Sequence, residues 1–222
     1  MKKVFFSNFV PYLFFLIICF PLIFLRKGLI VVFLNNLQTP ILNIFFINIS
    51  KIGNGVTIGI VGLFIGLLCR FKWFYMFVLA FCFQLMFVLL FKQLLFHNLH
   101  RPFLLLKETD SIHLVKLIEG VKIRYVNSFP SGHTTCIFFI VSFLSVLIKK
   151  RMISWGLFVI GLLVGISRIY LVQHFFVDVY FGICFGTVSS LLAYWVVKVY
   201  PKIWFEDKLR IRISLERKRA WD

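Results

Sequence analysis

The chain of 222 residues is 61% hydrophobic and has a mean hydropathy of +0.96, values that exclude an ordinary soluble domain and predict an integral membrane protein. The net charge of +17 falls between apolar runs and at the chain ends, without a zinc-finger, helix-turn-helix or single-strand-binding pattern, so we expect contacts with lipid head groups and no nucleic acid partner. The five cysteines are far apart in or beside apolar segments and indicate neither a disulfide framework nor a metal site.

In chain order, the apolar segments predict an all-α fold, an integral membrane bundle of six transmembrane helices that forms one domain over residues 1–222. We expect spans at about residues 9–25, 56–69, 73–96, 130–148, 153–169 and 176–199. The segment 29–49, after the first span, mixes apolar residues with asparagine and glutamine and is predicted to be an interfacial amphipathic helix. Residues 200–222 form a basic tail that we expect in the cytoplasm.

The distribution of basic residues predicts that both termini are cytoplasmic. In this topology the end of the third span, the start of the fourth and the link between the fifth and sixth all lie at the outer face. Arg26, Lys27 and the basic loop 107–124 run against the rule, because they also fall on the outer side.

The segment 167–178 contains Ser167, Arg168, His174 and Asp178 between two apolar runs. Ionisable residues at membrane depth are costly and usually functional. His174 and Asp178 are one helical turn apart, so the carboxylate could hold one ring nitrogen protonated and leave the other to attack an electrophile. A polar kink between two helices is the structural alternative.

The segment 130–133, Pro-Ser-Gly-His, opens the fourth span. Proline suits the first helical position, and the free backbone N–H groups after it form an anion site that Gly132 lets an oxygen approach closely. Ser131 adds a hydroxyl donor and His133 a proton donor. A simple capped helix start is the alternative here.

Three cations, Lys92, Arg101 and Arg168, lie near the same face in the predicted topology. Guanidinium forks and an ammonium group suit phosphate oxygens, and such donors stabilise the charge that spreads over a phosphoryl group during transfer.

Together these motifs resemble the type 2 phosphatidic acid phosphatase superfamily of membrane lipid phosphatases. The family pattern is Lys-x6-Arg-Pro, then Pro-Ser-Gly-His, then Ser-Arg-x5-His-x3-Asp. Residues 130–133 and 167–178 match the second and third motifs in full. The resemblance implies that His174 is the nucleophile, that Asp178 orients it, and that His133 is the general acid and base. It also implies that Lys92, Arg101, Ser131, Gly132 and Arg168 bind the phosphate, with no metal and no cofactor.

The first motif departs from this pattern, because eight residues separate Lys92 from Arg101 where the family has six. Nine steps along an unbroken helix turn the chain by about 900° and point the two side chains apart, whereas seven steps, about 700°, bring them to one face. We therefore predict that the third helix ends or distorts near His97 and Asn98.

The resulting hypothesis is a bacterial inner-membrane phosphatase that removes a phosphate monoester from a lipid at the periplasmic face through a phosphohistidine. Lipid A (the 4'- or 1-phosphate) is the first candidate substrate, since the basic loop 107–124 suits a lipid with more than one phosphate. Undecaprenyl diphosphate and phosphatidylglycerol phosphate fit the same motifs. A lipid phosphotransferase, a vanadate-binding haloperoxidase and a catalytically silent lipid-binding protein are the alternatives of other classes. The sequence gives no oligomeric state.

Overall fold

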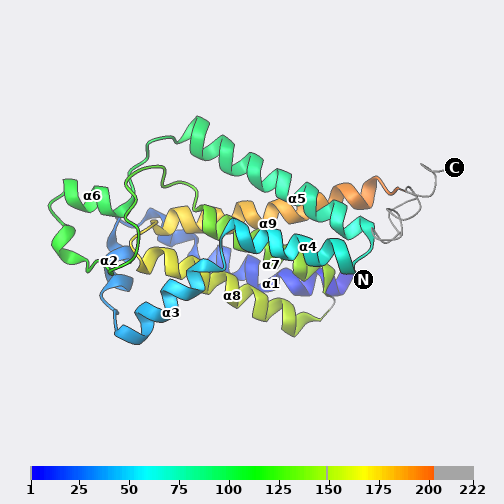
Figure 1. The fold of residues 1–222 in the computed structure, drawn as a ribbon, viewed down its shortest axis with the longest axis horizontal. Coiled ribbons are helices and arrows are strands. Elements are labelled where there is room, and N and C mark those ends of the chain that lie inside the picture. Colours follow the sequence, from blue (N-terminus) through cyan, green and yellow to red (C-terminus); the bar gives the residue numbers. More distant parts are fainter. Residues whose placement is uncertain (1, 149, 203–222) are drawn as a thin grey trace, which may run out of the picture.

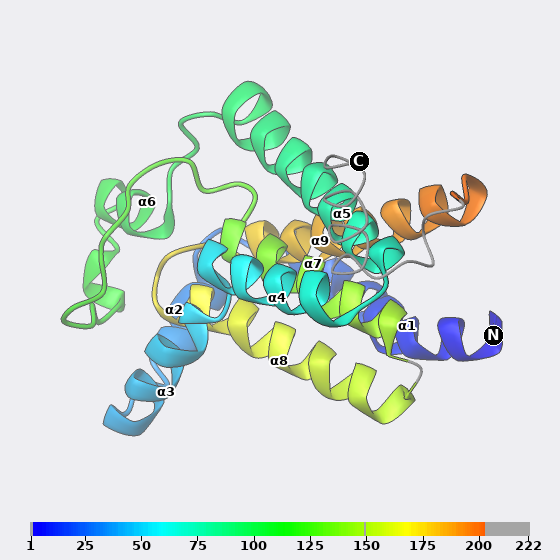
Figure 2. The same cartoon turned by 45° about the vertical axis from the view of Figure 1, so that its right-hand side comes forward.

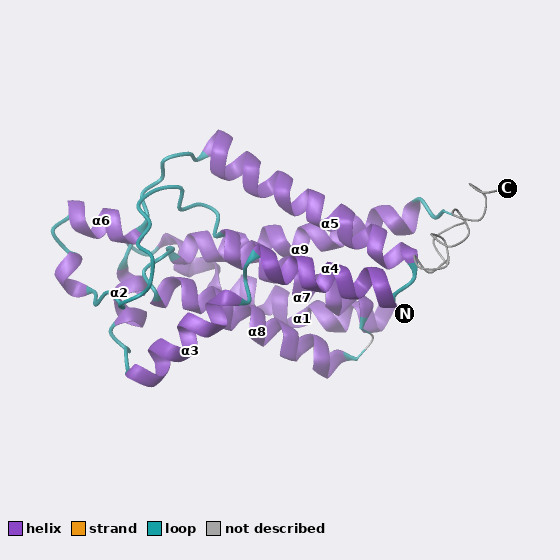
Figure 3. Cartoon of the chain, viewed as in Figure 1, coloured by secondary structure: helices purple, strands orange, loops and turns teal. Residues whose placement is uncertain are grey.

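Apolar runs separated by proline, glycine and polar capping residues fold as helices in this computed structural model, which describes residues 2–148 and 150–202. No strand occurs in these ranges, and the helices are joined by loops that are longest at one end of the bundle (Figure 3). The α-helices are α1 (Lys2–Cys19), α2 (Leu29–Asn35), α3 (Pro40–Lys51), α4 (Gly55–Leu68), α5 (Phe71–Leu89), α6 (Pro102–Glu108), α7 (Gly132–Leu147), α8 (Arg151–Tyr170) and α9 (Phe176–Val199). Short 3₁₀ helices cover Phe20–Phe24 and Ile112–Leu114, and a π-helical segment, Leu90–Leu95, continues α5.

Polar side chains fix where several helices begin. Thr39 accepts a hydrogen bond from the backbone of Leu42 at 3.2 Å and so caps α3, which has proline at its first position. Asn54 caps α4 in the same way through the amide of Thr57, at 3.0 Å. These caps define the breaks on both sides of α3.

The helices α7 and α9 form the centre of the bundle, with α8 and α5 packed beside them (Figure 1). Phe138 and Phe139 on α7 and Ile183 on α9 are fully buried. Small residues allow this close approach, since a Cβ atom at Gly186 would lie 2.5 Å from the carbonyl oxygen of Thr135. The two backbones are therefore in near contact.

The outer surface is that of a membrane protein. Four segments of the described chain have the length and hydropathy to cross a bilayer: 7–24, 71–95, 151–170 and 176–199. The pair α3 and α4, bent by 53° at its break, makes a fifth if it is taken as one span. The helix α7 is apolar but only 16 residues long, so four or five of the six predicted spans reach membrane length. Large side chains such as Phe14 and Leu68 are exposed, as lipid-facing residues would be.

The segment 29–49, predicted as one amphipathic helix, is two helices, α2 and α3, with a turn between them. Two asparagines of this segment, Asn35 and Asn43, are bonded within the protein. The side chain of Asn35, fully buried, bonds the backbone N–H and carbonyl of Lys116 and the carbonyl of Tyr170 at 2.7–3.1 Å. Asn43 accepts a hydrogen bond from the Tyr170 hydroxyl at 2.6 Å. Their polarity serves internal contacts and did not mark a water-facing stripe.

The chain leaves α5 through the π-helical segment, which ends at Leu95, and Asn98 then adopts a left-handed conformation with φ of 61°. The predicted distortion of the third helix is therefore present, and it starts earlier than His97. The N-terminus and the end of α9 lie at one end of the bundle, and α2 and α6 lie at the other (Figures 1 and 2). Most of the predicted basic tail, residues 203–222, is outside the described residues.

Candidate active site

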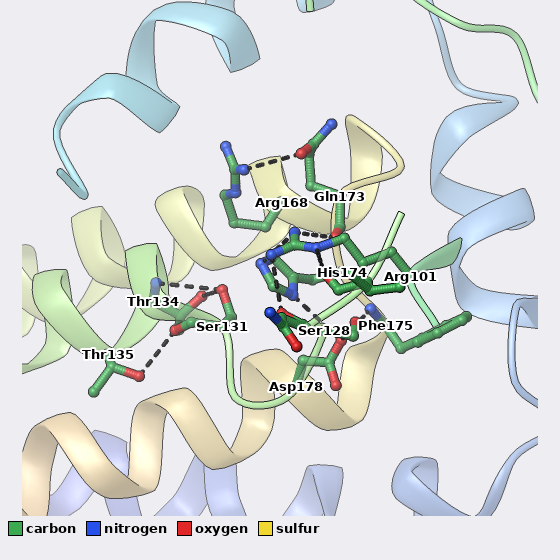
Figure 4. A network of polar contacts seen from close by, with 12 residues as sticks. Arg101, Ser128, Ser131, Thr134, Thr135, Arg168, Gln173, His174, Phe175 and Asp178 are labelled. Carbon is green, nitrogen blue, oxygen red and sulfur yellow. Dashed lines mark hydrogen bonds and ion pairs between the residues drawn. The ribbon is translucent and has the colours of Figure 1, made fainter. Parts of the chain in front are cut away.

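The end of α8 and the start of α9 bring the third motif together. After Tyr170 the chain reverses in five residues, and the backbone N–H groups of Gln173 and His174 both bond the carbonyl of Arg168, at 2.9 and 3.2 Å. Val172 in this turn has φ of 57°, a left-handed conformation that is unfavourable for a β-branched residue. The tight turn holds the His174 backbone against that of Arg168, and the His174 side chain, 2% exposed, lies at the end of the bundle where α7 begins (Figure 4).

Asp178 holds His174 from one side. Its Oδ2 atom lies 3.3 Å from Nδ1 of His174 and also accepts hydrogen bonds from the Phe175 backbone at 2.9 Å and the Ser128 hydroxyl at 2.5 Å. The Phe175 contact caps α9, so the same carboxylate starts the helix and faces the imidazole. All three side chains, those of Ser128, His174 and Asp178, are almost fully buried. The position of Asp178 is thus set by three donors.

Arg101 approaches His174 from the other side. One terminal nitrogen lies 3.1 Å from Nε2 of His174 and donates to the Gln173 carbonyl at 2.9 Å. The remaining nitrogens donate to the carbonyls of Val126 and Asn127 at 2.8 and 3.1 Å. Because guanidinium only donates, Nε2 must accept, and the ring proton therefore sits on Nδ1, facing Asp178. This is the tautomer in which Nε2 carries the lone pair.

The electrostatic environment favours the neutral imidazole. Burial, followed by the neighbouring charges of Arg101, Arg168 and Lys92, holds the pKa of His174 well below its ordinary value of 6.5. Burial and the charge of Arg124 lower the pKa of Arg101 to about 10, so it remains a cation at neutral pH. The site thus combines an uncharged nitrogen base with fixed positive charge.

Arg168 is the second buried guanidinium of the site, 7% exposed. One terminal nitrogen bonds the hydroxyl of Ser50 on α3, and the other is 3.5 Å from the side-chain oxygen of Gln173. Its Nε atom is buried and has no hydrogen-bond partner among the described residues. That N–H is therefore an unsatisfied donor within the site.

The start of α7 carries the second motif. Ser131 caps the helix and accepts hydrogen bonds from the backbone and hydroxyl of Thr134, at 3.4 and 2.9 Å, which leaves its own O–H as a donor. A Cβ atom at Gly132 would meet no atom within 4 Å, so open space lies beside the first helical N–H groups. His133 follows and is half-buried, within reach of the charges of Arg168 and Arg124. The motif thus presents donors beside an unfilled space.

Lys92 lies in the π-helical segment at the end of α5, half-buried. The charges of Arg101 and Asp178 act on its ammonium group, which places Lys92 near the site despite the longer spacing of the first motif. The wider π turn and the left-handed Asn98 change the direction of the chain, as the spacing required.

The predicted residues gather at one end of the bundle, around the turn from α8 to α9. Sequence reasoning did not assign three further groups: Ser128 on Asp178, Gln173 beside Arg168, and Ser50 on Arg168. Ser128 and Gln173 are adjacent to the motifs and could have been considered, but Ser50 is distant in sequence and carries no signal. Among residues 2–148 and 150–202, no three His, Cys, Asp or Glu side chains are grouped as a metal site would need.

The fold and this constellation define a multi-pass helical membrane protein with a buried histidine–aspartate pair among cations, a site suited to a phosphate ester. The chain belongs to the PAP2 superfamily, whose family model matches residues 71–201. The match includes every predicted site residue.

Two curated relatives carry related sequences. The bacitracin transport permease protein BcrC of Bacillus licheniformis is 37% identical over 109 residues, 49% of this chain and 47% of the relative. The undecaprenyl-diphosphatase BcrC of Bacillus subtilis strain 168 is 38% identical over 87 residues, 34% of this chain and 44% of the relative. The matches thus span less than half the length of either relative.

Two crystal structures share the fold. LpxE of Aquifex aeolicus aligns with a TM-score of 0.63 and 28% identity, over 74% of this chain and 92% of LpxE. The first transmembrane PAP2-type phosphatidylglycerolphosphate phosphatase from Bacillus subtilis aligns with a TM-score of 0.60 and 22% identity, over 89% and 99% of the two chains. The second likeness concerns the fold alone.

Proposed function

We propose that this protein is a membrane lipid phosphatase that acts through a phosphohistidine on His174. The observation that carries the proposal is the pair of contacts on that ring, Asp178 at Nδ1 and Arg101 at Nε2, at 3.3 and 3.1 Å. A carboxylate on one nitrogen and a phosphate-binding cation beside the other are what attack on phosphorus requires. Family membership supports the same reaction class.

In the first step the lone pair of Nε2 attacks phosphorus, the N–P bond forms and the bond from phosphorus to the lipid oxygen breaks. His133 gives its proton to that oxygen. Asp178 stabilises the positive charge that develops on His174. The phosphate replaces the contact between Arg101 and Nε2 and is held by the free N–H of Arg168, by Arg101 and Lys92, and by the Ser131 and Gly132 donors.

In the second step water gives a proton to His133 and attacks phosphorus, the N–P bond breaks and inorganic phosphate leaves. The negative charge of the bound phosphate lies among the cations of the site and stabilises the protonated, acid form of His133. Both steps balance without a metal ion or cofactor, and we propose that none takes part.

We further propose six spans in a bacterial inner membrane, with the site at the periplasmic face. The site lies at the end of the bundle opposite the N-terminus (Figure 1), which supports this orientation if the termini are cytoplasmic. The interfacial placement of α2 and α3 and a single domain over residues 1–222 belong to the same proposal.

Two lipids are the leading substrates. Lipid A suits the basic outer loop, where Lys107, Lys116, Lys122 and Arg124 could meet a second phosphate. Undecaprenyl diphosphate is favoured by the 38% identity to the relative named undecaprenyl-diphosphatase. Phosphatidylglycerol phosphate has the weaker support of a likeness in fold.

The test is phosphate release by purified protein in detergent, with the three lipids in parallel, with and without a chelator, and with His174→Ala as the control. Release from one lipid that is lost in His174→Ala and unaffected by chelator is the expected result. Loss of release with chelator would contradict the metal-free mechanism. Transfer of the phosphate to a lipid acceptor would identify a phosphotransferase, and no turnover of any lipid would favour a silent lipid-binding protein.

A further inference from the structure

The turn between α3 and α4 lies against the site although it precedes the region that the family model matches, residues 71–201. Here α3 ends at Lys51, α4 begins at Gly55, and the two axes are bent by 53°. Backbone that is not helical is costly at membrane depth and is tolerated where protein buries it. What the α3–α4 break contacts inside the protein therefore bears on its role.

Ser50, in the last turn of α3, is 5% exposed and accepts a hydrogen bond from a terminal nitrogen of Arg168. The other terminal nitrogen of Arg168 has only the long contact of 3.5 Å with Gln173. The hydrogen bond to Ser50 is thus the shorter of the two side-chain contacts that orient this guanidinium group. With both ends held, the buried Nε–H of Arg168 remains without a partner in the described ranges and is presented to an anion.

Gly53 brings the backbone of the turn against α7. A Cβ atom at this position would lie 2.9 Å from the carbonyl oxygen of His133, 3.1 Å from its Cβ and 2.8 Å from a methyl carbon of Val164. The residue is buried, and a glycine here is explained by lack of room, since φ is not in the left-handed range. The bare backbone of Gly53 thereby fixes how closely the turn approaches His133.

We propose that the α3–α4 turn is a positioning element of the site, in which Ser50 orients Arg168 and Gly53 sets the place of His133. The inference rests on the proposed function, because it takes Arg168 as a phosphate ligand and His133 as the proton carrier. The α3–α4 turn is thus a fourth segment of a site whose three sequence motifs all lie between the end of α5 and the start of α9. Neither residue touches substrate, so both act through another side chain.

Two alanine variants separate the two roles. In Gly53→Ala, displacement of His133 should lower kcat about tenfold or more and change the pH profile of kcat, with inhibition by inorganic phosphate little affected. In Ser50→Ala, loss of a hydrogen bond to a charged group should raise KM and the inhibition constant of inorganic phosphate about tenfold, with a smaller change in kcat.

The chain offers matched controls for both. A Cβ atom at Gly55, two residues further on, would meet nothing within 4 Å, so Gly55→Ala should keep wild-type kinetics. Ser154, at the far end of α8, is fully buried and its hydroxyl has no partner in the described part of the chain, so Ser154→Ala removes a buried hydroxyl without an effect on phosphate. Thermal unfolding of all four variants is measured beside the kinetics.

Kinetics of Gly53→Ala and Ser50→Ala that match their controls would overturn the inference. Loss of kcat and phosphate affinity in equal proportion, in step with loss of thermal stability, would also overturn it, because the turn would then be merely structural. If the wild-type protein hydrolyses no lipid, the proposed function fails separately. Calorimetric binding of inorganic phosphate then decides the inference, and equal affinities in Ser50→Ala and Ser154→Ala overturn it.

Discussion

Arg101→Lys keeps a positive charge at the site and removes the guanidinium fork. Four of the five N–H groups of Arg101 are occupied, on the carbonyls of Val126, Asn127 and Gln173 and on Nε2 of His174. A lysine ammonium is a single point on a flexible stem and cannot span partners that lie around a planar fork. We expect it to lose at least two of the four contacts.

The magnitude follows from those contacts. A hydrogen bond to a charged group contributes about 1.5 to 3 kcal/mol, so two lost contacts lower the free energy of unfolding by roughly 3 to 6 kcal/mol. Water can reach the carbonyl of the exposed Val126, which places the expectation near the lower value, about 3 kcal/mol. For catalysis, loss of about 2.8 kcal/mol of transition-state binding lowers kcat/KM about 100-fold.

The assay is phosphate release by the purified variant, with thermal unfolding in the same detergent. Arg26→Lys is the matched control, because Arg26 is exposed and lies outside the site. If Arg101→Lys kept the kcat/KM and unfolding temperature of Arg26→Lys, then charge alone would be sufficient at this position. The guanidinium fork would then contribute nothing beyond its charge.

Three further predictions follow from the geometry. Burial and the neighbouring cations lower the pKa of His174 below 6.5, so the neutral imidazole persists in mild acid. The acid limb of the pH profile of kcat/KM should therefore lie below pH 6.5, and stability should fall as the pH drops below 6.5; an acid limb at or above that value would contradict this. Gly132→Ala should leave thermal unfolding unchanged, because the new Cβ meets no protein atom within 4 Å. It should raise KM and the inhibition constant of phosphate several-fold, because the methyl group occupies the space proposed for the phosphate. Unchanged inhibition would show that the phosphate does not use this space. Gly186→Ala should lower the free energy of unfolding by about 1 to 3 kcal/mol, because the new Cβ would lie 2.5 Å from the Thr135 carbonyl oxygen. In the control Gly156→Ala the Cβ meets nothing within 4 Å, so stability should not fall. Equal melting temperatures of the two variants would refute the close packing of α7 and α9.

The sequence predicted the helical membrane architecture well, because long apolar runs have few other solutions. It also predicted that His174 and Asp178 face each other across four residues, and their side chains are 3.3 Å apart, although α9 begins at Phe176 and His174 lies in the loop before it. The prediction that the third helix must distort between Lys92 and Arg101 was confirmed, because the spacing was incompatible with one straight helix. Residue roles remain proposals, as does the count of six spans.

The errors and omissions came from contacts between distant segments. Asn35 and Asn43 contributed to the prediction of one amphipathic helix, but Asn35 bonds the backbone of Lys116 and Tyr170, and Asn43 bonds the side chain of Tyr170. These partners lie 81 to 135 positions away, and no local pattern encodes such contacts. Ser50 reaches Arg168 across 118 positions in the same way. Periodicity describes only near neighbours, so the partners of buried polar groups require the fold itself.

The contact between Arg101 and Nε2 of His174 bears on chemical reactivity in the idle protein. A lone pair that accepts a hydrogen bond from guanidinium is less available to stray electrophiles, and the ring is only 2% exposed. Reagents that acylate or alkylate histidine should therefore modify His174 slowly despite its neutral state. In the proposed mechanism this shielding of His174 ends when a phosphate draws the guanidinium away, so its reactivity would be confined to the time when a substrate is bound.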